Sequence, residues 1–260
     1  MLNIKAVAIC NKGKIRDNNE DNLLFQSKNL DEIHEGINGL WKQDAVETNN
    51  FFLYGVFDGM GGHSKGEYAS YVAAEVARRN LQRFSGMKEC VEEFLKNICM
   101  EANDHISGSA HRENRVIGTT ASMICIYEDM CWCCNIGDSP IFRVRDGVIT
   151  EFYEEHTERK LREMIFGKDK VKGTKFSLTQ HIGIPVEEMK IQPFLIKEQI
   201  KSKDQYLLCS DGLTDMVSQE EILNVMKADV NLEEKITLLE QKAMKYGGRD
   251  NITIICVEVK

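Results

Sequence analysis

Hydrophobic and polar positions recur along the chain with two periods, one of about two residues and one of about 3.6 residues. Apolar residues at helical spacing predict helices over residues 66–84, 88–105 and 232–246. Residues 218–221 (SQEE) form a capping box that opens a further short helix. Short runs rich in Val, Ile, Phe, Tyr and Cys predict strands at residues 1–10, 51–57, 120–127, 130–136, 140–145, 148–152, 206–209 and 252–257.

These elements succeed one another without repeats or linkers, which predicts a single domain over residues 1–260. The second strand should stop at Asp58-Gly59, because Asp-Gly is good turn chemistry. The strands from 120 to 152 should form an antiparallel meander with Asp146-Gly147 as a hairpin turn. Two polar or charged segments, 27–50 and 158–176, fit this regularity poorly. We expect surface excursions there, which are either plain loops or functional segments.

Acidic residues stand at the ends of apolar strands more often than turn chemistry alone requires. Asp58, Asp138 and Asp211 follow such strands, and Asp250 precedes one. Carboxylates beside apolar neighbours lose hydration, and several that face one another repel, whereas a bound cation relieves both problems. Oxygen ligands without nearby His or paired Cys favour Mg²⁺ or Mn²⁺ over Zn²⁺. The pattern therefore predicts a divalent metal site.

Arg16 lies close in sequence to Glu20 and Asp21, and these residues add a phosphate-sized anion site to the predicted cation site. An arginine side chain can bind two phosphate oxygens at once, and a neighbouring carboxylate can orient a water molecule on a metal ion. The combination points to chemistry on a phosphate group.

Charge and composition exclude several other classes of function. The chain has a net charge of -8 and a pI near 5.4, so we expect no nucleic-acid partner. No apolar window reaches the length of a membrane helix, and the first residues alternate rather than forming a secretion signal. The nine cysteines are scattered through apolar runs, which indicates reduced thiols. We expect a cytoplasmic monomer without a membrane partner.

The candidate residues fall in short ordered blocks: RDNNED at 16–21, FDGMGGH at 57–63, GTT at 118–120, NIGDS at 135–139, CSDGLTD at 209–215 and GRDN at 248–251. In this order and spacing they resemble the metal-dependent serine/threonine protein phosphatases of type 2C, the PPM family, particularly its bacterial branch. The resemblance covers residues 3–259. It implies an α+β fold, namely a four-layer αββα sandwich of two antiparallel sheets flanked by helices.

The same resemblance implies hydrolysis of phosphoserine and phosphothreonine in phosphoproteins, the targets of a serine/threonine kinase. A hydroxide that bridges two ions, Mn²⁺ or Mg²⁺, attacks phosphorus. The family roles carry over by position. Asp58 corresponds to the carboxylate that bridges both ions. Asp211 and Asp250 correspond to ligands of the first ion, and the Gly59 carbonyl corresponds to a ligand of the second. Glu20 and Asp21 correspond to acids that hold metal-bound waters, Asp215 to a further acid near a third ion, and Arg16 to the phosphate-binding arginine.

The chain departs from the family pattern at several positions. Many eukaryotic members carry a histidine directly after Asp-Gly as a proposed general acid, but Met60 stands there, and the role does not transfer to His63. Bacterial members usually place an aspartate shortly before Gly-Thr-Thr to hold a third metal, where this chain has Arg115 and Val116. We therefore expect two well-occupied ions. By the same comparison, residues 27–50 resemble an insertion and 158–176 the flap beside the active site.

Two rival interpretations stay open. Residues 10–16 match the C-x-x-G-x-x-R loop of cysteine-dependent phosphatases, with Cys10 and Arg16 as the reactive pair. The acids that follow Arg16 oppose this interpretation, because they would repel phosphate and raise the pKa of the thiol. The second rival is a phosphatase fold that has become a catalytically weak or inactive regulatory module. The cysteines at 131–134 are better explained by core packing, since strand alternation separates Cys131 and Cys133 from Cys134.

Overall fold

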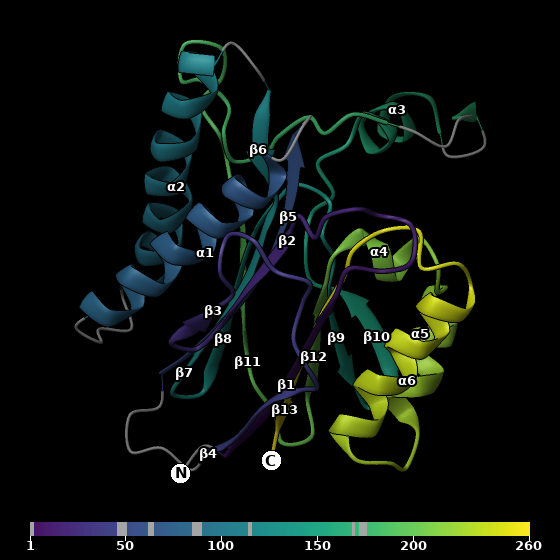
Figure 1. The fold of residues 1–260 in the computed structure, drawn as a ribbon. Helices are drawn as coiled ribbons and strands as arrows, with labels where there is room; N and C mark the ends of the chain where they lie inside the picture. The colour runs from purple at the N-terminus through teal and green to yellow at the C-terminus, as the bar shows by residue number, and fades with distance from the viewer. Residues whose placement is uncertain are drawn as a thin grey trace.

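The computed structural model describes residues 3–45, 51–61, 65–84, 90–113, 116–167, 170–171 and 176–260. Two antiparallel sheets pack face to face, and helices lie on the outer side of each sheet (Figure 1). This arrangement confirms the predicted α+β sandwich. Among the described residues, no helix is both long and apolar enough to cross a bilayer.

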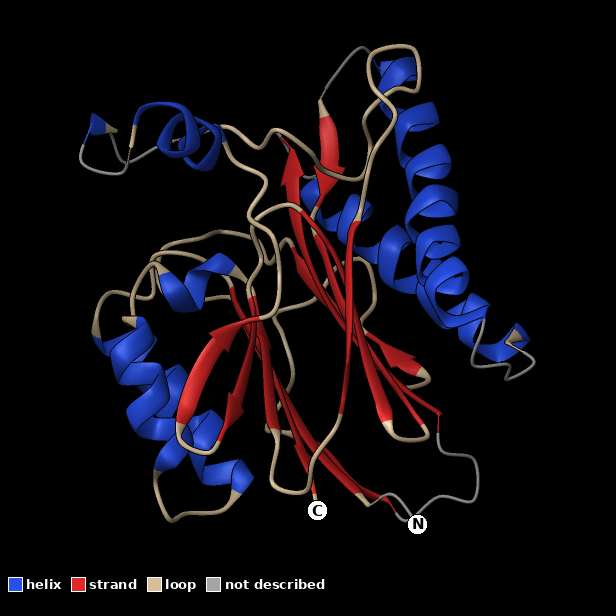
Figure 2. Cartoon of the chain, turned by 180° about the vertical axis from the view of Figure 1, so that it is seen from behind, coloured by secondary structure: helices blue, strands red, loops and turns tan. Residues whose placement is uncertain are grey.

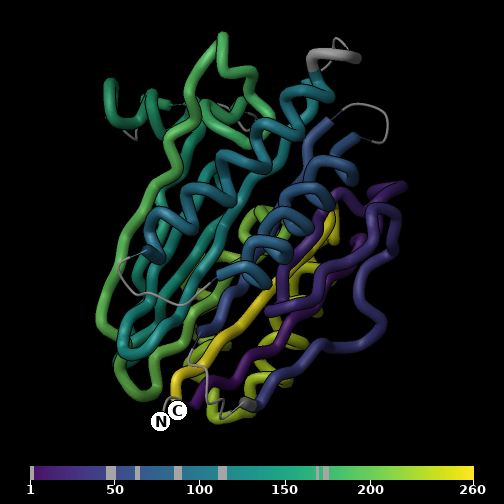
Figure 3. Tube along the Cα trace, turned by 90° about the vertical axis from the view of Figure 1, so that its left-hand side faces the viewer, coloured from purple at the N-terminus to yellow at the C-terminus, as the bar shows by residue number. Residues whose placement is uncertain are grey.

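The first sheet joins the two ends of the chain. Its spatial order is β10 (Val148–Glu151), β9 (Ile141–Arg145), β12 (Gln205–Cys209), β13 (Ile252–Val259), β1 (Ile4–Asn11) and β4 (Trp41–Ala45). Strands β1 and β13 pair along their full length, with Ile4 opposite Val259 and Asn11 opposite Ile252. Figure 3 shows these terminal strands side by side. Helices α4 (Asp211–Thr214), α5 (Gln219–Lys227) and α6 (Leu232–Lys245) cover the outer face.

The second sheet carries the longest described strand, β5 (Phe51–Gly61), near its middle. The order is β11 (Phe194–Gln199), β8 (Met130–Ile136), β7 (Ala121–Tyr127), β5, β2 (Asp21–Phe25) and β3 (Lys28–Asn29). A short strand, β6 (Ile117–Thr119), pairs with the last residues of β5. Helices α1 (Gly66–Arg83) and α2 (Val91–Glu113) lie beside each other on the outer face of this sheet (Figure 3).

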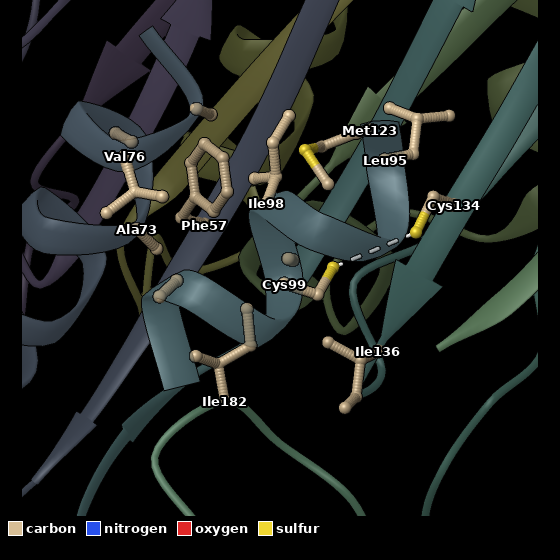
Figure 4. Packing of buried hydrophobic residues seen from close by; sticks show 14 of the residues in the cluster. Phe57, Ala73, Val76, Leu95, Ile98, Cys99, Met123, Cys134, Ile136 and Ile182 are labelled. Carbon is tan, nitrogen blue, oxygen red and sulfur yellow. Dashed lines mark hydrogen bonds between the residues drawn. The ribbon is translucent and has the colours of Figure 1, made fainter. Parts of the chain in front are cut away.

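Three apolar layers hold these four structural layers together, one between the sheets and one beneath each set of helices. Strand β8 shows how alternation divides its side chains between layers. Cys131 and Cys133 belong to the layer between the sheets, whereas Cys134 belongs to the layer under α1 and α2. Its sulfur lies 3.8 Å from that of Cys99 on α2 (Figure 4). The predicted division of these cysteines between two faces is confirmed.

Two of the predicted strand arrangements are wrong. Strand β5 does not stop at Asp58-Gly59 but continues to Gly61, because β6 pairs with its last residues. The strands from 120 to 152 do not form one meander. Strands β7 and β8 pair in the second sheet, whereas β9 and β10 pair in the first. The chain changes sheets at the loop after Ile136, which contains Gly137 at φ +100 and Asp138.

Neither polar segment is a plain loop. Residues 27–50 contain β3 and the edge strand β4, which pairs with β1, while 46–50 lie outside the described residues. The charged segment begins with helix α3 (Glu158–Phe166), whose N-cap Thr157 accepts a hydrogen bond from the Lys160 backbone N–H. Figure 2 shows α3 extending away from both sheets on its connecting loops.

Candidate active site

The second sheet supplies two cross-strand acids, Asp21 on β2 and Asp58 on β5. Like charges on directly opposite residues destabilise a sheet, so this pairing requires compensation. The backbone of Asp58 is held firmly. Thr119 Oγ1 donates to its carbonyl at 2.9 Å, and its own N–H donates to Thr120 Oγ1 at 3.0 Å. The Gly-Thr-Thr block therefore positions Asp58.

The first sheet brings two more acids to the same end of the sandwich. Asp211 opens α4 directly after β12, and Asp250 lies just before β13. Ser210 connects the two sheets, because its hydroxyl donates to Asp21 Oδ2 at 2.7 Å. Asn251 binds the Arg16–Asp21 loop from the other side: its Oδ1 accepts from the Glu20 N–H at 2.8 Å. Residues far apart in the sequence thus converge at one place.

The electrostatics of this place are dominated by buried negative charge. Burial raises the pKa of the Asp58 carboxyl well above its usual range, and the charges of Asp21, Asp211, Asp138 and Asp250 raise it further. Burial likewise raises the pKa of Asp21 to about 7, against which the hydrogen bond from Ser210 acts. The predicted acids therefore lie close enough to perturb one another strongly.

Asp211 and Asp138 share this environment. Burial raises the pKa of Asp211 well above its usual range, with Asp138 the next contributor. Burial also raises the pKa of Asp138 to about 6. Asp138 was one of the strand-terminal acids in the sequence but was not among the predicted metal ligands. The signal in the sequence that could have included it is its position after the apolar run that ends at Ile136-Gly137.

Arg16 and Glu20 stand at the outer side of the cluster. A nitrogen of the Arg16 guanidinium lies 2.5 Å from Asp250 Oδ2, and the Arg16 side chain is 50% exposed. Burial raises the pKa of Glu20 to about 7, and the nearby charge of Glu67 raises it further. The predicted combination of one arginine with several acids is therefore present in the structure.

Glycine at position 59 is required by close packing. A Cβ there would lie 2.1 Å from the Gly66 carbonyl oxygen and 2.5 Å from that of Glu20. The Gly59 N–H donates to the same Glu20 oxygen at 3.0 Å. The absence of a side chain therefore lets the start of α1 sit directly against β5 and the Glu20 loop.

Asp215 lies in a cavity of about 520 Å³, which Asp211 and Asp138 also line. Arg159 of α3 and Phe176 line the same cavity. Burial raises the pKa of Asp215, the charge of Asp250 adds to this, and Arg159 opposes it. The cavity thus connects the acidic cluster with the segment that was compared with a flap.

These acids suit a hard divalent cation in their chemistry. They are oxygen donors from both sheets, and their mutual repulsion is what a cation would relieve. Within the described ranges, however, no group of three or more His, Cys, Asp or Glu side chains is arranged so that it could hold a metal ion. The structure shows the donors gathered at one end of the sandwich rather than a complete coordination shell.

Two of the residues weighed in the sequence, His63 and Arg115, lie outside the described residues. Met60, directly after Asp58-Gly59, is on β5 opposite Gly118 of β6. Val116 is 73% exposed.

The structure opposes a cysteine mechanism. Cys10 is a buried residue of β1 in the layer between the sheets. Burial raises the pKa of its thiol to about 12, and the charge of Asp21 contributes to this. A nucleophilic cysteine needs the opposite shift. Cys10 is thus a core residue.

Comparison with known proteins agrees with this geometry. Residues 34–244 match the protein phosphatase 2C family. The serine/threonine phosphatase Stp of Listeria innocua is 30% identical over 256 residues, which cover 95% of this chain and 92% of that protein. The chain belongs to the protein phosphatase 2C family, whose members are metal-dependent hydrolases.

Solved structures share the fold over almost the whole chain. The serine/threonine phosphatase of S. agalactiae superposes with a TM-score of 0.82 at 24% identity, covering 99% of this chain and 100% of that one. The catalytic domain of the phosphatase PstP, solved with 2 manganese ions, gives a TM-score of 0.78 at 24% identity and covers 100% and 99% of the two chains.

Proposed function

We propose that this protein hydrolyses phosphoserine and phosphothreonine in phosphoproteins, with two divalent ions in the acidic centre. The observation that carries the proposal is the convergence of buried carboxylates from both sheets beside a half-exposed arginine. Family membership and the two manganese ions in PstP support the same reaction.

In the proposed site, Asp58 would contribute its carboxylate to both ions, because it lies among the other acids of the cluster. Asp211 and Asp250 would hold one ion, and the Gly59 carbonyl would hold the other. Glu20 and Asp21 would hold water molecules on the ions, and Asp215 lines the same cavity as Asp211. We propose Mn²⁺ or Mg²⁺ as the ions, because the donor set consists of oxygen atoms.

When bound, two such ions lower the pKa of a water molecule, so that hydroxide is available at neutral pH to attack phosphorus, and the ions also neutralise charge on the phosphoryl group. The protein supplies orientation. Asp250 holds the Arg16 guanidinium at 2.5 Å, and this half-exposed group has further N–H donors with which it would bind phosphate oxygens. Ser210 holds Asp21 in place from the opposite sheet.

The proposal extends to the substrates, the cellular compartment and the oligomeric state. We propose that the substrates are targets of a serine/threonine kinase and that the enzyme is a cytoplasmic monomer formed by one domain over residues 1–260. Nucleic acids are not proposed as partners, because the chain carries a net charge of -8.

The first test is metal dependence. Hydrolysis of a phosphothreonine peptide and of p-nitrophenyl phosphate should require Mn²⁺ or Mg²⁺ and should be lost in EDTA, because the carboxylates alone repel the phosphate. A phosphotyrosine peptide serves as the comparison substrate. Full activity in EDTA would contradict the proposal. A folded protein that binds Mn²⁺ but turns over no phosphomonoester would instead favour a regulatory module.

A further inference from the structure

The side chain of Asn103 on α2 is buried, and both ends of its amide bind the same loop. Its Oδ1 accepts a hydrogen bond from the Gly183 N–H at 2.7 Å, and its Nδ2 donates to the Ile184 carbonyl oxygen at 2.9 Å. Asparagine suits this place because its amide has a donor and an acceptor, one for each backbone group. We call residues 181–184 the Asn103-bound loop.

The Asn103-bound loop lies between α2 and strand β6 and touches both. Gly183 has φ +112, a conformation that favours glycine, and a Cβ there would lie 2.3 Å from the Ile117 carbonyl oxygen. A Cβ on Gly118 would in turn lie 2.4 Å from Nδ1 of His181. Ile182 belongs to the apolar layer beneath α2 (Figure 4). Because these contacts are so close, the loop cannot shift far without moving β6.

Strand β6 holds the centre of the candidate active site. Thr119 exchanges two backbone hydrogen bonds with Ile182 of the loop, at 3.0 and 2.9 Å. The hydroxyl of the same threonine donates to the Asp58 carbonyl, and Thr119 lies opposite Gly59 on β5. Asp58 and the Gly59 carbonyl are proposed metal ligands, so a shift of Thr119 would displace both. A continuous set of hydrogen bonds therefore leads from α2 through the loop to Asp58.

We propose that Asn103 is a positioning residue for the metal centre, because it fixes the Asn103-bound loop against β6 and so sets the places of Asp58 and Gly59. The proposal rests on the proposed function, since it gives Asn103 a role in the same site. Without the amide, the Gly183 N–H and the Ile184 carbonyl would lose their hydrogen-bond partner, and β6 would lose support. Residues that orient metal ligands from outside the coordination shell commonly tune metal affinity in this way.

The test is Asn103→Ala in the full chain. Its Mn²⁺ affinity, measured by titration calorimetry, should fall about tenfold. In saturating Mn²⁺, kcat for p-nitrophenyl phosphate should also fall about tenfold while KM stays within about twofold, because the phosphate-binding Arg16 is unchanged. Hydrogen exchange at residues 117–119 of the metal-free protein, measured by mass spectrometry, should become faster as β6 loses its support.

The matched control is Asn80→Ala, which removes another amide that binds across helices. Asn80 of α1 donates to Glu101 of α2 at 2.8 Å, about 21 Å along α1 from Gly66 beside the site. This variant should lower the stability toward urea but keep the wild-type Mn²⁺ affinity and the wild-type exchange at residues 117–119. It therefore separates a loss of stability from a loss of positioning.

An unchanged Mn²⁺ affinity in Asn103→Ala, or an equal fall in Asn80→Ala, overturns the proposal. So does a fall in affinity without faster exchange at residues 117–119, because the effect would then not pass through β6. If Asn103→Ala does not fold, Asn103→Ser keeps a hydroxyl group and should show smaller changes in the same direction. A wild type that binds Mn²⁺ but hydrolyses no phosphomonoester would reject the proposed function, while affinity and exchange would still decide the role of Asn103.

Discussion

Asp58 shows how much of a residue's chemistry comes from its neighbours rather than from its own strand. It lies opposite Asp21 across the β2–β5 pair, and the acids of the other sheet add to the repulsion. Without a cation its carboxyl group is driven toward the neutral form. A substitution that removes only the charge therefore separates the role of Asp58 in catalysis from its role in folding.

Asp58→Asn should lower metal-dependent kcat by at least about 100-fold, the scale of losing a group that stabilises charge in the transition state. Because the amide removes a repelling charge, the metal-free variant should unfold at a higher temperature than the metal-free wild type. Calorimetry and turnover of p-nitrophenyl phosphate measure the two effects. Cys10→Ser is the control and should keep most of the activity. If turnover were lost only in Cys10→Ser, the result would instead favour a mechanism with the Cys10 thiolate as nucleophile.

Most of the acids that the structure brings together were recognisable in the sequence, because they stand in short blocks beside glycine, asparagine or serine. Their supporting residues were harder to assign. Ser210 binds Asp21 over 189 sequence positions, and Asn251 binds the Glu20 N–H over 231. No local pattern encodes such contacts, although both residues flank a predicted ligand. Asp138 was visible as a strand-terminal acid, but its proximity to Asp58 depends on how the two sheets stack.

Among the elements, the junction between β5 and α1 connects the fold most directly with the site. Gly59 touches the first residue of α1 and the Glu20 loop, and it also pairs with Thr119 of β6. The local sequence predicted a turn here because Asp-Gly favours one. The strand continues instead because it pairs with β6. Local sequence could not show this, because β6 lies far along the chain. Pairing between distant segments overrides local preference.

Gly59→Ala should destabilise the protein by about 1–3 kcal/mol or more and lower its Mn²⁺ affinity, because the new methyl group has to displace backbone atoms. Gly61→Ala on the same strand is the matched comparison. Its Cβ would lie 3.1 Å from the nearest atom, the Gly66 nitrogen, so its effect should be smaller. Urea denaturation and titration calorimetry measure these changes. Equal stability of the two variants and the wild type would contradict this prediction. It would show that the start of α1 can move to make room for the methyl group without lowering the free energy of unfolding.

At the scale of the whole molecule, the layered fold was implied by the order of blocks along the chain, whereas the exchange of strands between sheets was not. The meander expected from 120 to 152 is divided because the chain changes sheets after Ile136. That exchange brings Asp138 close enough to Asp58 and Asp211 for its charge to raise the pKa of both carboxyl groups. The candidate site is consequently a property of the complete sandwich rather than of any one segment.

The stability of the metal-free protein should fall as the pH rises from about 4 toward 7. Burial raises the pKa of Asp21 and of Glu20 to about 7, above their usual values near 4. The folded state therefore binds more protons than the unfolded state in this window, so raising the pH favours unfolding. Thermal unfolding in EDTA at pH 5 and pH 8 measures the effect, and Mn²⁺ should restore more stability at pH 8. A metal-free protein that is more stable at pH 8 than at pH 5 would contradict the predicted direction of the pH dependence.

The apolar layer between the sheets acts as a spacer for chemistry that takes place at its edge. One sheet presents Asp21 and Asp58, the other Asp211 and Asp250, and the side chains between the sheets set the gap between these two pairs of acids. A change of volume deep in this layer, at Tyr54 or Tyr206 for example, would alter the distance between the two pairs of acids. Adaptation of this enzyme to another ion or temperature can therefore begin in its interior.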